Sequence, residues 1–160
     1  MELRGVEELM DLLHACRGTP EHGGGGPFAG TADSADPVDL HQHALQTAAL
    51  LRRSRPADKE LQIAGLVHVI GRLLAPGDPT RHARTAADAV RHLLGERVAR
   101  LVHDSPHATD LDPHVDADTL TLRQADEAGR APGFDAGVLE DWRTLLELVA
   151  EQHSRLGAVD

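Results

Sequence analysis

The sequence predicts an all-α protein, a single domain of 160 residues built as one bundle of about seven helices. Apolar residues recur at intervals of three and four along most of the chain, which is the spacing of one helix face. No stretch alternates apolar and polar residues as a half-buried strand does, and no internal repeat is visible. Leu, Ala and Val must fill the core, because the chain has two Phe, one Trp and no Tyr.

The N-terminal part is predicted to hold one helix and one long loop. Residues 1–18 carry apolar side chains at helical spacing, and Gly18 would end the helix. Residues 19–35 contain four consecutive glycines, whose backbone freedom predicts a surface loop or, alternatively, a lid over a site. We expect the helical core over residues 36–156.

The first two core helices are predicted from their starts and their apolar content. Asp36-Pro37 indicates a helix start, because Pro is tolerated in the first turn, and this helix should run to about residue 54. The next should cover residues 58–74 and lie at the centre, because it is apolar nearly all round. His68 stands in its middle. A buried polar group without a partner costs about 1–3 kcal/mol, so this imidazole needs a carbonyl, another side chain or a metal ion.

Four further helices and one loop complete the expected bundle. Gly and Pro residues mark several of their ends. The last helix has an apolar stripe that includes Trp142, which we expect in the core rather than at a substrate site. The expected helices cover about residues 80–95, 96–104, 116–129 and 136–156, and the loop covers 105–115.

Charge and composition limit the classes of partner. The formal net charge of −10 argues against nucleic acid or an anionic membrane as a partner and leaves a small-molecule substrate as the expectation. Cys16 is the only cysteine, so no internal disulfide can form, and we expect a reducing, cytoplasmic environment. The chain shows no secretory signal and no apolar run of membrane length. The oligomeric state is not predicted.

Five polar residues fall on the inward faces of different predicted helices. Imidazoles and a carboxylate are ligands that iron, manganese or zinc accepts, and helical bundles often present such ligands to their core. A single buried histidine is more typical of a hydrogen-bonded core residue, so a shared metal or acid–base site and separate core histidines both remain open. The five residues are His43, His68, His82, His103 and Asp126.

Three segments in the same order resemble motifs of HD-domain proteins. They are residues 36–48, 65–74 and 120–133. More narrowly, these segments are similar to the branch that contains the mixed-valent di-iron oxygenases that cleave phosphonates, together with predicted HD phosphohydrolases. Myo-inositol oxygenase is a more distant relative. The resemblance covers about residues 36–149 and implies an HD-like helical bundle.

The resemblance implies a role for each of the five residues. His43 would be the first metal-binding histidine, and His68 would be the histidine of the His-Asp doublet. His82 and His103 would bind a second ion, and Asp126 would be the closing carboxylate. The implied cofactor is iron, as one or two ions, with manganese, zinc or no metal as alternatives.

Residues outside this ligand set are implied in catalysis. Asp36 stands at the position of a lid glutamate in the oxygenase branch, and Asp33 at the position of a lid tyrosine. His107 stands where that branch has a lysine that contacts the phosphonate. His107 and Asp36 are therefore expected catalytic residues, together with His68 of the ligand set.

The chain departs from the family at Val69, where HD proteins have an aspartate that bridges two metal ions. Without that bridge, His43, His68 and Asp126 could form a two-histidine, one-carboxylate set like the facial triad of non-haem iron enzymes. The expected function is a divergent, oxygenase-like metalloprotein that acts on a small polar metabolite. The alternatives are a metal-free binding protein or acid–base catalyst and, further, a phosphohydrolase.

The remaining histidines are expected at the surface, His41 because it stands two residues before His43 and so points away from the inner face. Arg123 and Arg130 are expected to pair with carboxylates on their own helix. The histidines expected at the surface are His14, His22, His41, His92, His114 and His153.

Overall fold

The computed structural model describes residues 3–17, 39–108, 111, 113–130 and 136–158. Within these residues the chain forms eight α-helices and three short 3-10 helices and contains no strand, so the predicted all-α class is confirmed. The α-helices are α1 (Val6–Ala15), α2 (Leu40–Ser54), α3 (Lys59–Val67), α4 (Ile70–Leu74), α5 (His82–Leu94), α6 (Glu96–Asp104), α7 (Ala117–Ala128) and α8 (Arg143–Ala158). The 3-10 helices are η1 (Pro79–Arg81), η2 (Ser105–His107) and η3 (Leu139–Trp142).

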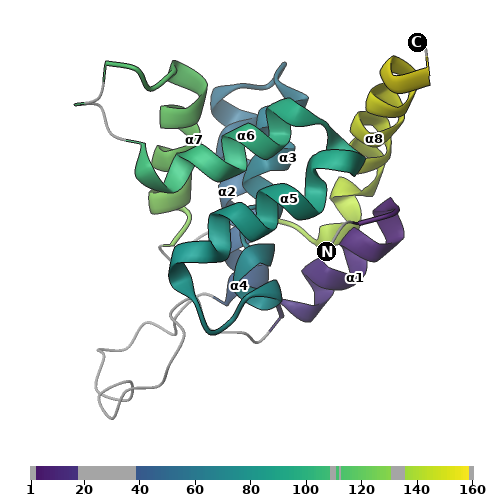
Figure 1. Cartoon of the computed structure of the whole chain (residues 1–160), viewed down its shortest axis with the longest axis horizontal. Helices are drawn as coiled ribbons and strands as arrows, with labels where there is room; N and C mark the ends of the chain where they lie inside the picture. The colour runs from purple at the N-terminus through teal and green to yellow at the C-terminus, as the bar shows by residue number, and fades with distance from the viewer. Residues whose placement is uncertain (1–2, 18–38, 109–110, 112, 131–135, 159–160) are drawn as a thin grey trace.

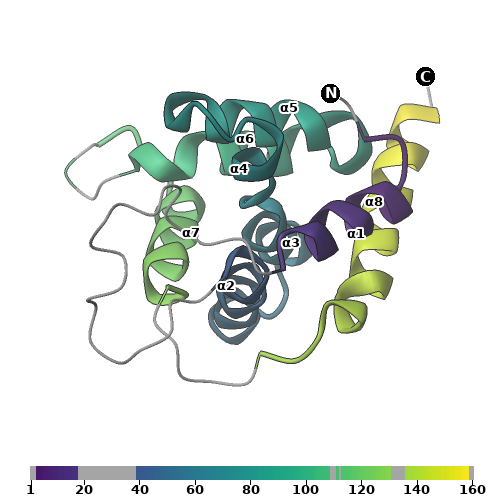
Figure 2. The same cartoon turned by 90° about the horizontal axis from the view of Figure 1, so that it is seen from below.

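Helices α2 and α3 lie at the centre of the bundle (Figures 1 and 2). Helices α5 and α6 pack against each other and cover one side of this pair, while α7 flanks it at one end and α1 and α8 at the other. A continuous cluster of buried apolar side chains includes residues of α1 to α8. Helix α2 contacts both α3 and α7, and α3 contacts α7, so these three helices form the part of the fold that positions the site.

Aspartate side chains cap the N-termini of three of the helices. Asp39, Asp58 and Asp116 each accept a hydrogen bond from a backbone amide three residues later, at the starts of α2, α3 and α7. Such caps satisfy amides that have no partner inside the helix. The backbone of Asp39 is extended (φ −73°, ψ 170°), so the expectation that this helix starts at Asp36 is wrong by about one turn.

The central helix predicted over residues 58–74 is broken after its third turn. Helix α3 ends at Val67, and α4 begins only at Ile70. In a continuous helix the carbonyl of Gly65 would accept from the amide of Val69. It accepts instead from Nδ1 of His68 at 2.5 Å. A side chain that bonds to the nearby backbone in this way competes with the helical ladder.

The last predicted helix begins later than expected. Residues 136–138 are not helical, because Gly137 has φ +82° and Val138 is extended (φ −122°, ψ 158°). A positive φ strongly favours glycine and interrupts a helix. The chain becomes helical at η3 and continues as α8. Trp142 is 1% exposed, as expected for a core residue, and Arg52 lies over its ring at 3.9 Å.

His41 is buried, contrary to the prediction of a surface position. It is 6% exposed, and its Nδ1 donates to the carbonyl oxygen of Leu13 at 2.9 Å. The ring of His14 in α1 stacks on it with 5.9 Å between centroids. Helix α1 covers this face of α2, and the apolar pattern of α2 alone could not show which helix packs there.

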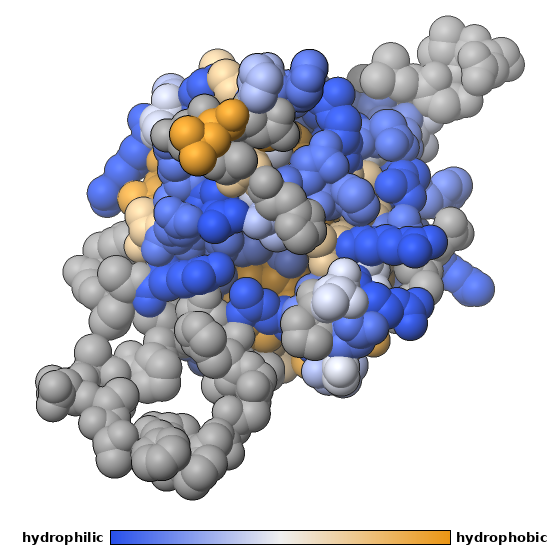
Figure 3. Space-filling view, turned by 60° about the vertical axis from the view of Figure 1, so that its left-hand side comes forward, coloured by the Kyte–Doolittle hydropathy of each residue, from blue (hydrophilic) through white to orange (hydrophobic). Residues whose placement is uncertain are grey.

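The surface is mostly hydrophilic on the face drawn in Figure 3, where apolar residues occupy only small areas. The large hydrophobic residues exposed among those described are Leu111 (87%) and Val138 (55%). No helix in the described ranges is long and apolar enough to cross a membrane.

Asp58 connects the turn between α2 and α3 to α6. Arg97 donates from Nη2 to Oδ2 of Asp58 at 2.7 Å and from Nη1 to Oδ1 at 2.8 Å. The same guanidinium contacts Glu60 at 3.1 Å and Asp118, in α7, at 3.0 Å. The hydrogen bond from Arg97 lowers the pKa of Asp58 most, partial burial raises it, and the amide of Leu61 lowers it further. Folding therefore favours the ionised form of Asp58.

We expect Asp58→Asn to lower the free energy of unfolding at pH 7 by about 1 kcal/mol, because Asn still caps α3 but loses the charged pair with Arg97. A carboxyl group with a lowered folded-state pKa adds stability above its unfolded pKa of about 3.9 and loses it as pH falls through the folded value. The difference between wild type and variant should therefore be complete at pH 6 and shrink below about pH 4.

Urea denaturation at pH 7 and pH 3 measures this difference. Asp11→Asn, at an exposed position of α1, is the matched control and should change little at either pH. An equal loss of stability at both pH values would show that the charge of Asp58 is not responsible.

Candidate metal centre

Three side chains from three helices bring their ligand atoms together inside the bundle. His43 lies in the first turn of α2, His68 directly follows α3, and Asp126 lies in the last turn of α7. Nε2 of His43 is 2.7 Å from Oδ1 of Asp126, and Nε2 of His68 is 2.9 Å from the same oxygen. The two Nε2 atoms are 3.2 Å apart. Three of the five residues expected on inward faces thus form one cluster.

The cluster is buried, with one side close to solvent. The side chain of His43 is 0% exposed, and those of His68 and Asp126 are each 12% exposed. Access to the three ligand atoms is therefore along the side of His68 and Asp126. A ligand that binds to these three atoms would lose most of its contacts with water.

The break between α3 and α4 determines how His68 presents its ring. Because a carbonyl oxygen only accepts hydrogen bonds, Nδ1 of His68 carries the proton in its contact with Gly65. In the neutral ring Nε2 is then the atom with a free lone pair, and this atom faces His43 and Asp126. Metal-binding histidines commonly have this arrangement, in which a backbone carbonyl fixes the other ring nitrogen.

The environment of Asp126 favours its carboxylate form. Burial raises the pKa of Asp126, but the positive charge of His68 in its protonated form and the hydrogen bonds that His43 and protonated His68 donate lower it more, so the net shift is well below the usual range. The other oxygen, Oδ2, faces Nη2 of Arg130 at 3.5 Å. The cluster therefore holds an ionised carboxylate against two imidazoles.

His43 leaves one ring nitrogen without a partner. Its Nδ1 is buried and has no hydrogen bond, while its Nε2 lies within hydrogen-bond distance of both other members. One proton on Nε2 of His43 satisfies Asp126, but the lone pair of His68 still faces the same carboxylate oxygen. A cation among the three atoms would bind the Nε2 lone pairs of both histidines and the carboxylate oxygen, while Nδ1 of His43 would keep its proton without an acceptor.

The spacing of the three atoms fits one kind of coordination. Two ligand atoms about 2.1 Å from a metal ion are roughly 3.0 Å apart at right angles and roughly 3.4 Å apart at a tetrahedral angle. The three separations in the cluster, 2.7, 2.9 and 3.2 Å, are close to the right-angle value. His43, His68 and Asp126 therefore form a group whose ligand atoms could hold one metal ion.

His82 and His103 do not belong to this cluster. His82 is partly buried at the start of α5, and its Nε2 is buried without a hydrogen bond. His103 is not on an inward face, because its side chain is 51% exposed and its Nδ1 is 2.8 Å from Oδ1 of Asp104. It lies in the last turn of α6, past the buried residues that form the helical stripe. A second ion held by His82 and His103 stays a prediction.

Three residues with implied roles lie outside the part of the chain whose side chains the structure describes. These are Asp33 and Asp36 of the predicted lid and the side chain of His107. Their roles in catalysis stay predictions.

Val69, at the bridging position, is 1% exposed and directly precedes α4. Its side chain has no ligand atom, and the cluster contains one carboxylate, that of Asp126.

Sequence reasoning anticipated some of the surrounding contacts and missed others. Arg130 and Arg123 pair with carboxylates at i−4 and i+4 as expected, with Arg123 2.9 Å from Glu127. Gln46 was not anticipated. It is 1% exposed, and its Nε2 donates to the carbonyl oxygen of Gly129 at 2.7 Å, which joins α2 to the end of α7. Its position three residues after His43, on the same side of the helix, is the signal that could have found it.

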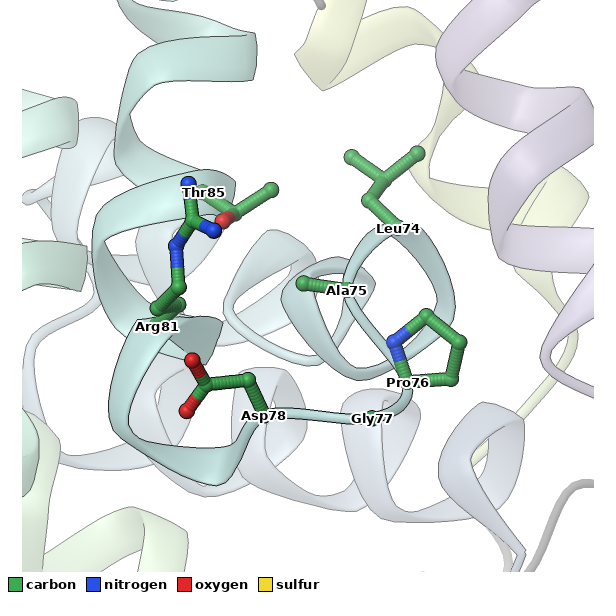
Figure 4. Close-up of a pocket in the computed structure, with 7 residues that line it drawn as sticks. All are labelled: Leu74, Ala75, Pro76, Gly77, Asp78, Arg81 and Thr85. Atoms are coloured by element: carbon green, nitrogen blue, oxygen red, sulfur yellow. The ribbon is translucent and has the colours of Figure 1, made fainter.

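A surface pocket of about 350 Å³ lies at the turn between α4 and α5 (Figure 4). Asp78, Arg81 and Thr85 bring polar groups to it, and Leu74 and Pro76 are among its apolar residues. None of the cluster residues lines this pocket, and the pocket is open to solvent. The candidate site therefore remains the cluster of His43, His68 and Asp126.

In comparisons with known proteins, no family model matches the sequence and no curated protein matches it. The resemblance to HD-domain proteins stays a prediction from the three motifs.

Proposed function

We propose that this protein is a divergent HD-domain metalloprotein that binds one iron or manganese ion through His43, His68 and Asp126 and acts as an oxygenase-like enzyme on a small polar metabolite. The observation that carries the proposal is the set of three ligand atoms separated by 2.7–3.2 Å. Sequence order supports the family assignment, since the three residues fall within the three HD-like motifs.

Each residue would have a separate task. His68, fixed by the Gly65 carbonyl, would present Nε2 in one orientation, and Asp126 would supply the negative charge that favours a divalent cation. His43, fully buried, would close the inner side of the site. When bound, the ion would supply Lewis-acid and redox chemistry at the positions that the three residues leave open. Burial would keep bulk water from the reacting groups.

Metal reconstitution tests the proposal. The purified full chain is stripped with a chelator, incubated under anaerobic conditions with Fe²⁺, Mn²⁺ or Zn²⁺, desalted and analysed for metal by mass spectrometry. We expect about one equivalent of iron or manganese per chain. Retention of no metal would contradict the proposal, and retention of two equivalents would contradict its single-ion form.

Activity assays separate the proposed chemistry from the alternatives. The iron-loaded protein is incubated with a panel of small organophosphonates, polyols and hydroxy acids, and oxygen consumption is measured with an electrode. Oxygen consumption that depends on one of these compounds is the expected result. Hydrolysis of phosphate esters without oxygen consumption would favour the phosphohydrolase alternative. Activity without bound metal would favour acid–base catalysis by the His43–Asp126 pair, whose atoms are 2.7 Å apart.

A further inference from the structure

Thr47 of α2 lies beside both α3 and the end of α7. It is fully buried in α2, and glycines from two other segments face it. A Cβ atom on Gly65 in α3 would be 3.2 Å from Cγ2 of Thr47 and 2.5 Å from Cδ1 of Leu51. A Cβ atom on Gly129, at the end of α7, would be 2.5 Å from Oγ1 and 3.1 Å from the backbone nitrogen of Thr47. Neither glycine could carry a side chain without moving its neighbours.

Each member of this contact is about one helical turn from a ligand on its own segment. Thr47 follows His43 by four residues, and its Oγ1 donates to the His43 carbonyl oxygen at 2.8 Å. Gly65 precedes His68 by three residues and accepts the hydrogen bond that fixes its ring. Gly129 follows Asp126 by three residues. The contact therefore lies directly beside the three ligands.

Backbone conformation does not explain why glycine occupies these two positions. Gly129 has φ −71° and ψ −9°, which any residue adopts. Gly65 is inside α3, where glycine is less favourable than alanine. The reason that remains is close packing, by Leu51 and Thr47 at Gly65 and by Thr47 at Gly129.

We infer that Gly65, Thr47 and Gly129 form a positioning junction that sets the spacing of the three ligand atoms and thereby the size of ion that the site prefers. This inference rests on the proposed metal function. Helices pack so closely that a single added methyl group displaces the neighbouring backbone. A methyl group on Gly129 would move the end of α7 away from α2, and Asp126 would move away from His43 with it.

Gly129→Ala is the main test. We expect Zn²⁺ affinity, measured by competition with a chromophoric chelator, to fall by about tenfold, as for other changes behind metal ligands. Because Mn²⁺ is the larger ion, the affinity of the site for Mn²⁺ should fall less. The ratio of Zn²⁺ affinity to Mn²⁺ affinity should therefore decrease by about threefold or more. The double variant Thr47→Ala/Gly129→Ala, which removes Oγ1, should recover most of the wild-type ratio.

Gly77→Ala is the matched control, because no atom lies within 4 Å of the Cβ position there. It should leave both affinities unchanged. If Gly129→Ala does not fold, Gln46→Met, which removes the hydrogen bond to the Gly129 carbonyl oxygen, should change the ratio in the same direction. Thermal melting of each metal-free variant, followed by circular dichroism, reports stability separately.

Two results would overturn the inference. One is a lower melting temperature for Gly129→Ala with an unchanged affinity ratio, which would make the junction a packing contact only. The other is wild-type affinity for both ions in Gly129→Ala. Failure of the wild-type protein itself to bind metal would be a different result, because it would overturn the proposed function and with it this inference.

Discussion

Asp126→Asn should remove tight metal binding, lowering affinity for Mn²⁺ or Fe²⁺ by about 100-fold or more. Asparagine keeps the size of the side chain but lacks the negative charge, and its amide can present a donor where the carboxylate only accepts. In the wild type Oδ1 of Asp126 lies 2.7 and 2.9 Å from the two imidazoles. It is the carboxylate oxygen of the three-atom set, so its replacement removes the negative charge of the site. Isothermal titration of the metal-free protein measures the loss.

Asp104→Asn is the control for this substitution. Asp104 also lies beside a histidine, since its Oδ1 is 2.8 Å from Nδ1 of His103, but both side chains are about half exposed. Its substitution should leave metal affinity within about twofold, because exposed pairs of this kind contribute little. Equal losses in the two variants would point to a general charge effect. Unchanged affinity in Asp126→Asn would show that this carboxylate does not bind the ion.

Gly71→Ala should lower the free energy of unfolding by about 3 kcal/mol, the upper part of the range for overpacking in a core. A Cβ atom on Gly71 would be 1.9 Å from the carbonyl oxygen of His82 and 2.6 Å from its carbonyl carbon. Both are backbone atoms, so no side-chain rotation can relieve the overlap. Helix α4 would have to separate from α5, which it contacts in the wild type.

Urea denaturation followed by circular dichroism measures this loss, with Gly77→Ala as control. Gly77 lies in the exposed turn after α4, and its substitution should change stability by no more than about 0.5 kcal/mol. A Gly71→Ala variant as stable as the control would mean that α4 and α5 can separate at no cost. That result would remove the reason for a glycine at this position.

The sequence predicted those features that depend on one helix at a time. Apolar spacing was enough to indicate the helical class and to select His43, His68 and Asp126 as inward residues. Features that depend on a second segment could not be predicted in this way. His41 is buried because α1 covers it, and at the break after Val67 the side chain of His68 donates to the carbonyl oxygen of Gly65. His103 kept the helical spacing but lies past the part of α6 that the core covers.

The two oxygens of the Asp126 carboxylate face different neighbours, which has a consequence for the proposed metal site. Oδ1 faces the imidazoles, whereas Oδ2 is turned toward Arg130 at 3.5 Å. In the proposed metal site this carboxylate would bind the ion through Oδ1 alone, so the three residues would supply three donor atoms. A molecule with two adjacent oxygen donors, such as a hydroxy acid or a vicinal diol, would then bind the same ion at positions that the protein leaves open.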